Sequence, residues 1–300
     1  MKAINLTKTT KIKKQLPLVI GFFDVIHLGH KLLFKDLANK KFNVLLITNS
    51  PNKQVNINSL QNRINNLSIL QPQNVFIYDV LKNKNITDKQ FVKLIKQTIN
   101  PNQIIVGNNF KYGKNAKGNI SLLKKYFNVQ NIKLNSEYKT SKIKHWIQTG
   151  KYSLIHASLV FPIIYEFVVI KGKQLSRQWG YPTLNSKLNL NKQINLKPGT
   201  YATLTGINNQ YYLSATYVAD IDKKSKTQVM ETHVLDTNLS FNHYGKKINL
   251  FFIEYLKKNT FCKSHFDLQK ALTSNINLVK RYFKNPKRSW LFHKLCQDSY

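Results

Sequence analysis

The sequence predicts an α/β doubly wound domain followed by an antiparallel β-barrel domain with a C-terminal helix. Up to about residue 135, short apolar runs alternate with segments of helical spacing, which is typical of βαβ units. After about residue 160, short runs rich in β-branched residues and tyrosine follow one another between turns, which is typical of an antiparallel barrel or sandwich. The change of texture falls within 150–162, so we expect one domain over 1–157 and a second over 158–300.

Composition places the chain among globular proteins. Hydrophobic residues make up 42% of the 300 residues and aromatic residues 12%. The two cysteines, Cys262 and Cys296, are far apart and lack metal-ligand spacing, which argues against a disulfide framework and favours the cytoplasm. Pro162 and Glu166 interrupt the longest apolar run, 157–170, which is too short to cross a bilayer. We therefore expect a cytoplasmic protein without a membrane partner.

The formal net charge of +34 suggests a polyanionic partner. Lysine, asparagine and isoleucine are all abundant, however, and all three have AT-rich codons, so codon bias also explains the lysines. The basic residues are scattered, and no RNA-binding signature accompanies them. We expect non-specific binding of polyanions at low salt, but no specific nucleic acid partner.

The strands expected in the first domain are nearly continuous in apolar residues, as in parallel sheets covered on both faces. They are 16–22, 42–48, 74–80 and 102–107. Helical spacing occurs between them, over 29–40, 59–70 and 88–99, and Thr87 or Asp88 could cap the last of these.

In the second domain the expected strands are short, and apolar and polar residues alternate along them only in part. They are 165–173, 199–207, 210–221, 229–236 and 247–256. Helical spacing returns over 266–284.

Two histidines lie where the first predicted strand turns into a helix, in "GFFDVIHLGH" (21–30). A helix that begins near Leu28 points its unpaired N–H groups and its positive dipole end at an anion. Residues three apart share a helical face, so His27 and His30 can contact one polyphosphate and stabilise a leaving pyrophosphate. The alternative is two histidines in a polar loop, which the coincidence of strand, glycine and helix disfavours.

The other residues of this motif predict close backbone approach. Gly21 and Gly29 lack side chains, so a ligand can come near the main chain. Asp24 is better placed to fix the turn than to touch an anion. A second anion site is expected in the glycine-bearing basic loop after the fourth strand, because no acidic residue occurs from Lys89 to Ser136.

At these motifs the chain resembles the bacterial bifunctional riboflavin kinase/FAD synthetase family. "GFFDVIHLGH" matches the GxFDxxHxGH signature of nucleotidyltransferases, and "IIVGNNFKYG" and "YKTSKIK" are similar to later adenylyltransferase motifs. The resemblance implies that His27 and His30 are catalytic. It implies ATP and phosphate contacts at Gly21, Phe23, Asp24, Gly29, Thr140, Ser141 and Lys144. It also implies a flavin and nucleotide loop with Gly107, Asn109, Phe110 and Gly113.

The second half resembles the riboflavin kinase domain of this family through "KGKQLSRQWGYPTLN" and "METHVLD". By themselves these segments would be a turn before a strand and a strand with a solvent-facing glutamate. The resemblance implies that Thr183 and Asn185 hold Mg²⁺ and that Glu231 is the general base. It implies phosphate contacts in the preceding loop at Gly172, Lys173 and Arg177.

Some segments depart from the family pattern. Lys144 replaces an arginine and gives up bidentate phosphate geometry. "TNSPNKQ" (48–54) lacks the family's histidine, Ser176 stands for another small residue, and 216–228 replaces a segment that walls the flavin site.

The resemblance implies two reactions of FAD biosynthesis. ATP phosphorylates riboflavin to FMN, and a second ATP adenylylates FMN to FAD with release of pyrophosphate, with Mg²⁺ as cofactor. Two alternatives remain open at this point. One is a monofunctional FAD synthetase with a vestigial kinase domain, and the other is a non-catalytic basic relative that binds RNA.

Overall fold

The computed structural model describes residues 1–12, 14–51, 55–135, 137–172, 174–208, 210–222, 226–237 and 243–285. Lys173, one of the expected phosphate contacts, and Cys296 lie outside the described residues. The chain divides into two compact units, and each is described by itself. Unit 1 comprises Met1–Thr140 with Ser158–Phe161, and unit 2 comprises Ser141–Ala157 with the described residues from Pro162 onward. Among the described helices, none is both long and apolar enough to span a membrane.

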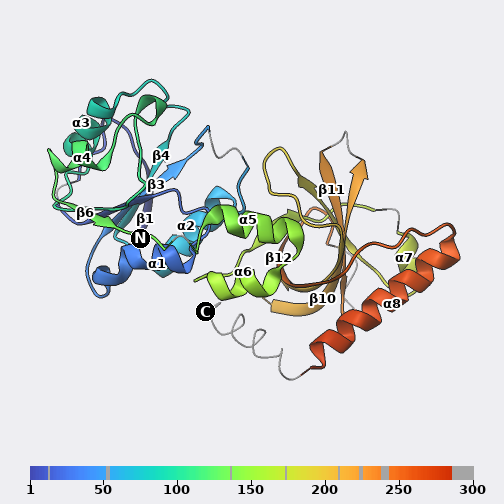
Figure 1. The fold of residues 1–300 in the computed structure, drawn as a ribbon. Coiled ribbons are helices and arrows are strands. Elements are labelled where there is room, and N and C mark those ends of the chain that lie inside the picture. Colours follow the sequence, from blue (N-terminus) through green and yellow to red (C-terminus); the bar gives the residue numbers. More distant parts are fainter. Residues whose placement is uncertain are drawn as a thin grey trace. The chain divides into compact units, whose positions relative to one another are not determined.

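Unit 1 is built on a six-stranded parallel sheet in the order β1-β4-β3-β2-β5-β6 (Figure 1). The strands are β1 Lys2–Asn5, β2 Leu18–Gly21, β3 Asn43–Thr48, β4 Asn74–Asp79, β5 Ile104–Gly107 and β6 Val129–Ile132. The four predicted strands form the centre of the sheet. The edge strands β1 and β6 were not predicted, because each is short and partly polar, and neither has a fully buried residue.

Helices cover both faces of this sheet, as a doubly wound fold requires (Figure 1). They are α1 Leu28–Phe34, η1 Lys35–Leu37, α2 Leu60–Ile69, α3 Asp88–Thr98, η2 Lys114–Ala116 and α4 Ile120–Lys124. Phe91 and Leu123 pack in one core cluster, while Leu33 and Leu67 pack in the other. Thr87 caps α3 as predicted, in a capping box with Gln90.

Unit 2 is built on a nearly closed antiparallel barrel in the order β7-β12-β9-β10-β11-β8. The strands are β7 Tyr165–Val168, β8 Leu184–Asn189, β9 Gly199–Ile207, β10 Gln210–Asp222, β11 Thr227–Val234 and β12 Lys247–Lys257. A bridge between Ile170 and Asn185 joins the two ends of the sheet. β8 follows the turn in "GYPTLN", where the sequence indicated a strand without giving its bounds, because its alternation is weak. The predicted fold class is confirmed in both units.

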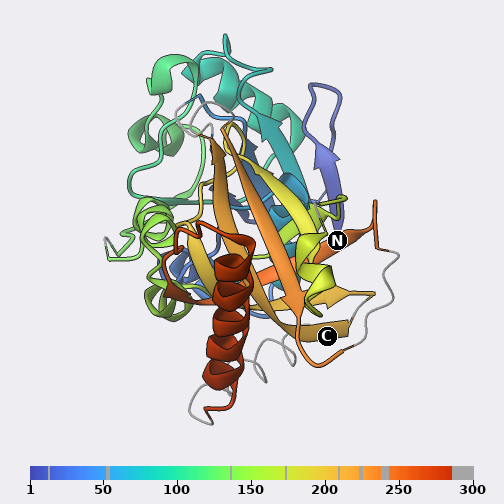
Figure 2. The same cartoon turned by 90° about the vertical axis from the view of Figure 1, so that its right-hand side faces the viewer.

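The helices of unit 2 are α5 Thr140–Thr149, α6 Tyr152–Ser158, α7 Leu175–Gln178 and α8 His265–Phe283. α8 lies along the outside of the barrel (Figure 2), where Ile276 and Val279 pack on Ala202 and Leu204 of β9. The inner face of β9 is also filled, so all nine of its residues are buried. The domain division at 157/158 stays a prediction.

Candidate active sites

The first candidate site lies at the edge of the parallel sheet where β2 and β5 end. From β2 the chain builds the sheet to one side through β3 and β4, and then returns to form β5 on the other side of β2. This reversal is a topological switch point, the place where open α/β sheets bind ligands. The loops 22–27 and 108–118 leave these two neighbouring strands at the same edge.

The histidine pair lies at the start of α1. His27 is the N-cap residue, and its Nδ1 accepts a hydrogen bond from the His30 backbone N–H at 3.3 Å. The two rings stack, with centroids 3.7 Å apart and planes 16° apart. His27 is only 3% exposed, whereas His30 is half-buried and is the ring more open to a ligand.

Hydrogen bonds fix the proton positions on the two rings. Because His27 Nδ1 accepts a bond, its neutral form carries the proton on Nε2, which can donate to a phosphate. His30 Nδ1 donates to the Val25 carbonyl at 3.1 Å, so His30 Nε2 can donate only when the ring is cationic. Burial lowers the pKa of His27 to about 4, which keeps that ring neutral.

We expect the buried His27 to make the protein sensitive to acid. The pKa of His27 is near 6.5 in the unfolded chain and about 4 in the folded one, so the unfolded chain binds the proton first as the pH falls. Stability should fall between pH 6.5 and pH 4 by about 3 kcal/mol. His27→Asn keeps a capping side chain but does not titrate, so its urea unfolding, followed by circular dichroism, should depend less steeply on pH. Equal slopes for the two proteins would contradict this account of His27.

The glycines of the motif make room for protein groups. A Cβ on Gly21 would clash with the Phe23 ring, which is buried. A Cβ on Gly29 would lie 3.1 Å from both His27 Nδ1 and the Tyr138 carbonyl oxygen. We expected a ligand to occupy the space beside these two glycines. Phe23, His27 and Tyr138 of the same unit occupy it instead. Gly21 and Gly29 allow the histidine loop to pack.

Asp24 anchors the histidine loop to the segment before α2. It is 1% exposed, and its carboxylate accepts the backbone N–H groups of Ile57 and Asn58, each at 3.0 Å. The Asn58 side chain donates back to the Asp24 carbonyl at 2.9 Å. This reciprocal pairing gives Asp24 the turn-fixing role expected for it.

Arg63 is a site residue that the sequence reasoning missed. Its guanidinium is 2% exposed and donates to the carbonyls of Phe22, Phe23 and Ile47, where β2 and β3 end. Burial lowers the pKa of Arg63 to about 10, which leaves it charged, and the negative charge of Asp24 acts in the opposite direction. Arg63 therefore ties together the strand ends beside the histidine pair.

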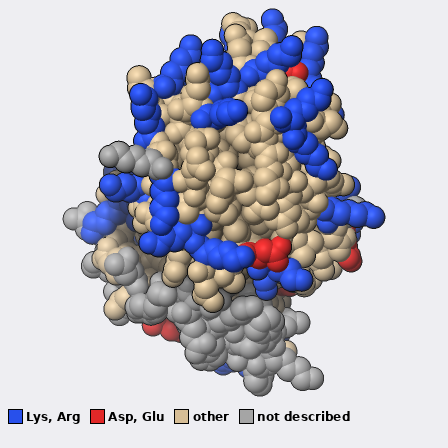
Figure 3. Space-filling view, turned by 90° about the vertical axis from the view of Figure 1, so that its left-hand side faces the viewer, with Lys and Arg blue, Asp and Glu red and all other residues tan. Residues whose placement is uncertain are grey.

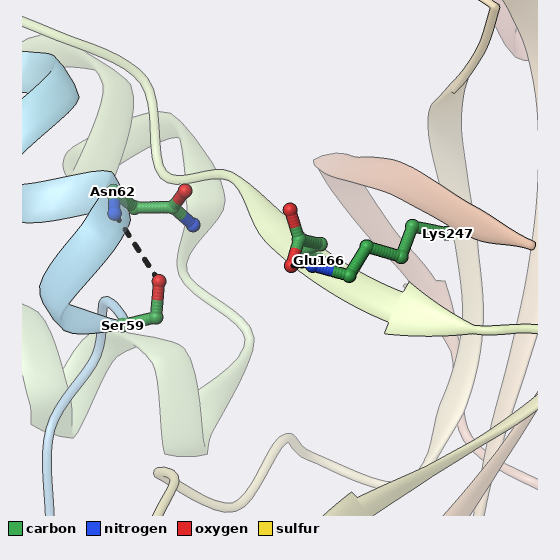
Figure 4. Close-up of polar contacts among 4 residues, drawn as sticks. All are labelled: Ser59, Asn62, Glu166 and Lys247. Carbon is green, nitrogen blue, oxygen red and sulfur yellow. Dashed lines mark hydrogen bonds and ion pairs between the residues drawn. The ribbon is translucent and has the colours of Figure 1, made fainter.

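The start of α2 fixes where Arg63 lies. The Ser59 hydroxyl accepts the Asn62 backbone N–H at 3.2 Å and caps the helix (Figure 4). Arg63 follows one residue later, among buried positions of the helix that include Ile64 and Leu67. Arg63 shares a helical face with the buried Leu67, four residues later, and this spacing is the signal that could have identified it from sequence.

Removing the Arg63 guanidinium should damage the first site without touching the barrel. Arg63→Met leaves three carbonyls and the buried Asp24 without their cation, so we expect a loss of about 3 kcal/mol in unfolding free energy. FAD formation from FMN should fall more than about tenfold through the misplaced histidine loop. Arg63→Lys keeps the charge but loses the planar fork of donors. Its rate of FAD formation should therefore lie between those of wild type and Arg63→Met. Wild-type FAD formation by Arg63→Met would refute this positioning role.

The loop after β5 also reaches this edge. Asn109 is exposed, and Phe110 is half-buried with its ring stacked on Tyr112 at 5.6 Å. Gly107 and Gly113 are packed closely: a Cβ would meet Leu134 at 2.6 Å from the first and the Asp88 backbone at 2.7 Å from the second. Gly113 also has a φ of 72°, which favours glycine. Of the four residues predicted for the flavin and nucleotide loop, Asn109 and Phe110 are thus the two that can face a ligand.

The surface of unit 1 is strongly basic. Lys111, Lys114 and Lys117 are exposed on the loop after β5. A space-filling view of one face of the molecule shows lysine and arginine side chains spread over the surface, with few carboxylates (Figure 3). Such a field attracts nucleotides to the sheet edge.

The remaining phosphate contacts predicted for the first site, Thr140, Ser141 and Lys144, lie at the start of α5. Thr140 is half-buried and closes the first part of unit 1, whereas Ser141 and Lys144 belong to unit 2. Their contact with the nucleotide stays a prediction.

The second candidate site lies on the barrel where β8 begins. The Asn185 side-chain amide donates to the Thr183 carbonyl at 3.3 Å and lies 3.4 Å from Thr183 Oγ1. Ser176 Oγ lies 3.2 Å from the same hydroxyl. The His233 ring donates through Nδ1 to the Pro182 carbonyl at 2.9 Å and so ties this segment to β11. The result is a pair of oxygen-bearing side chains close together, which fits a Mg²⁺ ion that takes few protein ligands and several phosphate oxygens.

Glu231 lies next to this pair. It is directly opposite Asn185 of β8 and Tyr217 of β10, and directly paired residues of an antiparallel sheet point to the same face. Burial raises the pKa of Tyr217, and the negative charge of Glu231 raises it further. Glu231 is exposed, so a substrate hydroxyl can reach it. The structure therefore brings the expected base and the expected metal ligands together.

The expected phosphate loop forms one wall of a pocket in this unit. Arg177 is exposed on α7, and a Cβ on Gly172 would meet the Asn185 side chain at 2.6 Å. The pocket is lined by Val169, Gln174, Ser176, Arg177, Pro182, Thr183, Leu184, Asn185, Thr232, Val234, Thr237, His243 and Tyr244. An ion pair between Glu166 and Lys247 at 3.0 Å joins β7 to β12 in the same barrel (Figure 4).

Comparison with known proteins assigns the two halves separately. Residues 9–149 match the FAD synthetase family model, and residues 159–283 match the riboflavin kinase family model. A macrolide-efflux protein structure from Streptococcus pneumoniae has the same fold, with a TM-score of 0.80, 21% identity, and coverage of 93% of this chain and 98% of that one.

Several relatives match over most of this chain. A bifunctional riboflavin kinase/FMN adenylyltransferase of Mycoplasma pneumoniae is 30% identical over 90% of this chain and 98% of its own length. One of Buchnera aphidicola subsp. Schizaphis graminum is 28% identical over 91% and 96%. A trifunctional protein RibF/MnmA of Mycoplasmoides gallisepticum is 29% identical over 96% of this chain, which spans 43% of that protein. The chain thus belongs to the bifunctional riboflavin kinase/FMN adenylyltransferase family, transferases of FAD biosynthesis.

Proposed function

We propose that the chain makes FAD from riboflavin in two ATP-dependent steps, with one active site in each unit. The observation that supports this most directly is that each half places its own reactive group beside its own phosphate-binding features. In unit 1 these are His27, His30 and the start of α1 at the switch point. In unit 2 they are Thr183 and Asn185 beside Glu231.

In unit 1 the proposed reaction is adenylyl transfer. A phosphate oxygen of FMN attacks the α-phosphorus of ATP, and the bond from that phosphorus to the bridging oxygen breaks to release pyrophosphate. His27 donates through Nε2–H, and His30 donates as an imidazolium, so both stabilise the negative charge that grows on the leaving group. Asp24 and Arg63 hold the histidine loop in place while this happens.

In unit 2 the proposed reaction is phosphoryl transfer. The 5′-hydroxyl of riboflavin attacks the γ-phosphorus of ATP, and the bond to ADP breaks. Glu231 accepts the hydroxyl proton, and Arg177 lies on the pocket wall where it can contact the phosphates. Thr183 and Asn185 would hold Mg²⁺, which neutralises charge on the transferred group.

Two sequence-based alternatives are less well supported. A vestigial kinase would not need Thr183, Asn185 and Glu231 to be grouped. An RNA-binding relative without activity would not need a buried aspartate and arginine to hold the histidine loop. Two cysteines in 300 residues and ATP as co-substrate favour the cytoplasm as the place of reaction.

Feeding the two flavins separately tests the proposal. With ATP and Mg²⁺, riboflavin should give FMN and then FAD, and FMN alone should give FAD and pyrophosphate, as followed by chromatography. FAD from FMN without FMN from riboflavin would identify a monofunctional synthetase. If neither flavin is converted while RNA binds with a steep salt dependence, the binding alternative holds instead.

A further inference from the structure

Three lysines line a hollow at the amino edge of the parallel sheet in unit 1. Lys11 and Lys14 belong to the segment that leads into β2, and Lys41 belongs to the segment that leads into β3. The histidine pair lies beyond the carboxyl end of β2, at the opposite edge of the same sheet. The hollow has a volume of about 340 Å³, and its lining is completed by Ile12, Leu16, Gln73 and Asn74.

Backbone hydrogen bonds hold the segments around this hollow. Asn43 N–H donates to the Pro17 carbonyl at 2.8 Å, and Gln73 N–H donates to the Phe42 carbonyl at 2.7 Å. These bonds join the chain just before β2, β3 and β4, so the walls of the hollow are fixed by the sheet. An anion in the hollow would have to order only the lysine side chains.

No described carboxylate forms an ion pair with these lysines. Among the described residues, the ion pairs involve Lys247 and Lys280 of unit 2. Asp36 is the acidic residue nearest to Lys41 in the sequence, and its carboxylate accepts a hydrogen bond from Gln130 of the edge strand β6. Three positive charges therefore meet at the hollow without a described negative partner.

A nearby helix end does not account for this charge. Ile12 N–H donates to the Thr98 carbonyl at 3.0 Å where α3 ends, so the negative end of that helix lies beside the hollow. A helix end carries about half an elementary charge, and its effect is confined to the last turn. Three lysines exceed it. Codon bias explains how many lysines the chain contains, but by itself it does not place three of them around one hollow.

The shape of the hollow restricts the anion. Ligand cavities in proteins measure upward of about 300 Å³, so a small molecule fits. A nucleic acid strand carries one charge about every 3.4 Å and needs a track of cations. A di- or triphosphate instead concentrates its charges on one compact group, which suits lysine point charges that surround a single hollow. The exposed Gln73 amide can add a neutral donor.

We propose that this hollow binds the polyphosphate group of a small molecule, either an inorganic polyphosphate or a nucleotide. Lys11, Lys14 and Lys41 contact the phosphate oxygens together. The site contains no residue of either proposed active site, and the inference does not depend on either flavin reaction.

Acetylation of lysine side chains by acetic anhydride, measured residue by residue by mass spectrometry, tests the proposal on the whole chain. The probe is inorganic triphosphate without Mg²⁺, at about 0.15 M salt so that diffuse attraction is screened. Saturating triphosphate should slow acetylation of Lys11, Lys14 and Lys41 at least about fivefold, with one half-protecting concentration for all three. Lys93, exposed on α3, should change less than about twofold.

Lys41→Gln shows whether the lysines share one anion. It removes one of three charges, so protection of Lys11 and Lys14 should require about threefold more triphosphate or a larger excess. Lys93→Gln is the matched control, because it changes the net charge equally and lies outside the hollow. It should leave the protection of Lys11 and Lys14 unchanged.

ATP distinguishes the two sources of the polyphosphate group. If ATP protects Lys11 and Lys14 at lower concentrations than inorganic triphosphate, the occupant is a nucleotide. If it needs equal or higher concentrations, the occupant is the inorganic anion.

Several results would overturn the inference. Equal slowing at Lys93 would show a diffuse effect of charge. Protection that Lys41→Gln leaves unchanged would show that the lysines act separately, and protection by single-stranded RNA without protection by triphosphate would show an extended partner. Loss of the protection in the protein with alanine at His27 and His30 would assign it to the first active site. Because the readout is local to the hollow, failure of either flavin reaction would leave this test valid.

Discussion

Replacing both His27 and His30 by alanine is expected to slow FAD formation from FMN about a thousandfold. The reason is that the two rings supply the donors that stabilise the leaving pyrophosphate at the start of α1. Loss of one such donor typically costs 10²–10³-fold in rate, and stacked rings that act together are not additive. FMN formation from riboflavin should stay at the wild-type rate, because the kinase groups belong to the barrel of unit 2.

Single variants distinguish the two histidines. His30→Ala should lose most of the activity, since His30 is the ring that is more open to a ligand. Lys31→Ala is the matched control, because Lys31 is exposed on the same helix. FAD formation at the wild-type rate by the double variant would exclude the pair from the reaction.

Glu231→Gln is expected to slow FMN formation from riboflavin by about a hundredfold or more. The amide keeps the shape of the side chain but cannot accept the proton of the riboflavin hydroxyl. Because the substitution leaves Thr183 and Asn185 in place, the effect should appear in kcat and leave the KM for ATP nearly unchanged. FAD formation from supplied FMN should not change.

Glu166→Gln is the matched control for this substitution. Glu166 is an exposed glutamate of the same barrel, and it pairs with Lys247. Exposed pairs contribute little to stability, so this variant should phosphorylate riboflavin as wild type does. Equal effects of the two substitutions would show that Glu231 acts only through the general charge of the barrel.

The strands that the sequence predicted are those with a strong local signal. The four central strands of unit 1 are apolar on both faces, so a short apolar run is enough to identify them. β1, β6 and β8 are defined by pairing with distant strands, and their own residues are mixed or polar. Local patterns contain no information about such pairing.

The same distinction applies to the sites. His27, His30, Thr183 and Asn185 lie in short motifs that a reader of the sequence can recognise. Arg63 could not be placed in this way, because its partners, the carbonyls at the ends of β2 and β3, are brought to it only by folding.

Composition contained a clue to Arg63. Only four of the 47 basic residues are arginine. In a chain biased toward lysine, an arginine suggests a position where the planar fork of donors is needed. Arg63 at the strand ends and Arg177 at the barrel pocket both fit this interpretation.

The claim that two independent active sites operate in one chain is tested most directly by mixing two variants. The protein with alanine at His27 and His30 should convert riboflavin to FMN and stop, and Glu231→Gln should make almost no FMN or FAD from riboflavin. Mixed in equal amounts with riboflavin, ATP and Mg²⁺, they should again produce FAD, because FMN released by one protein is a substrate for the other. If the histidine variant has also lost FMN formation, or if the mixture makes no FAD, the two-site account is wrong.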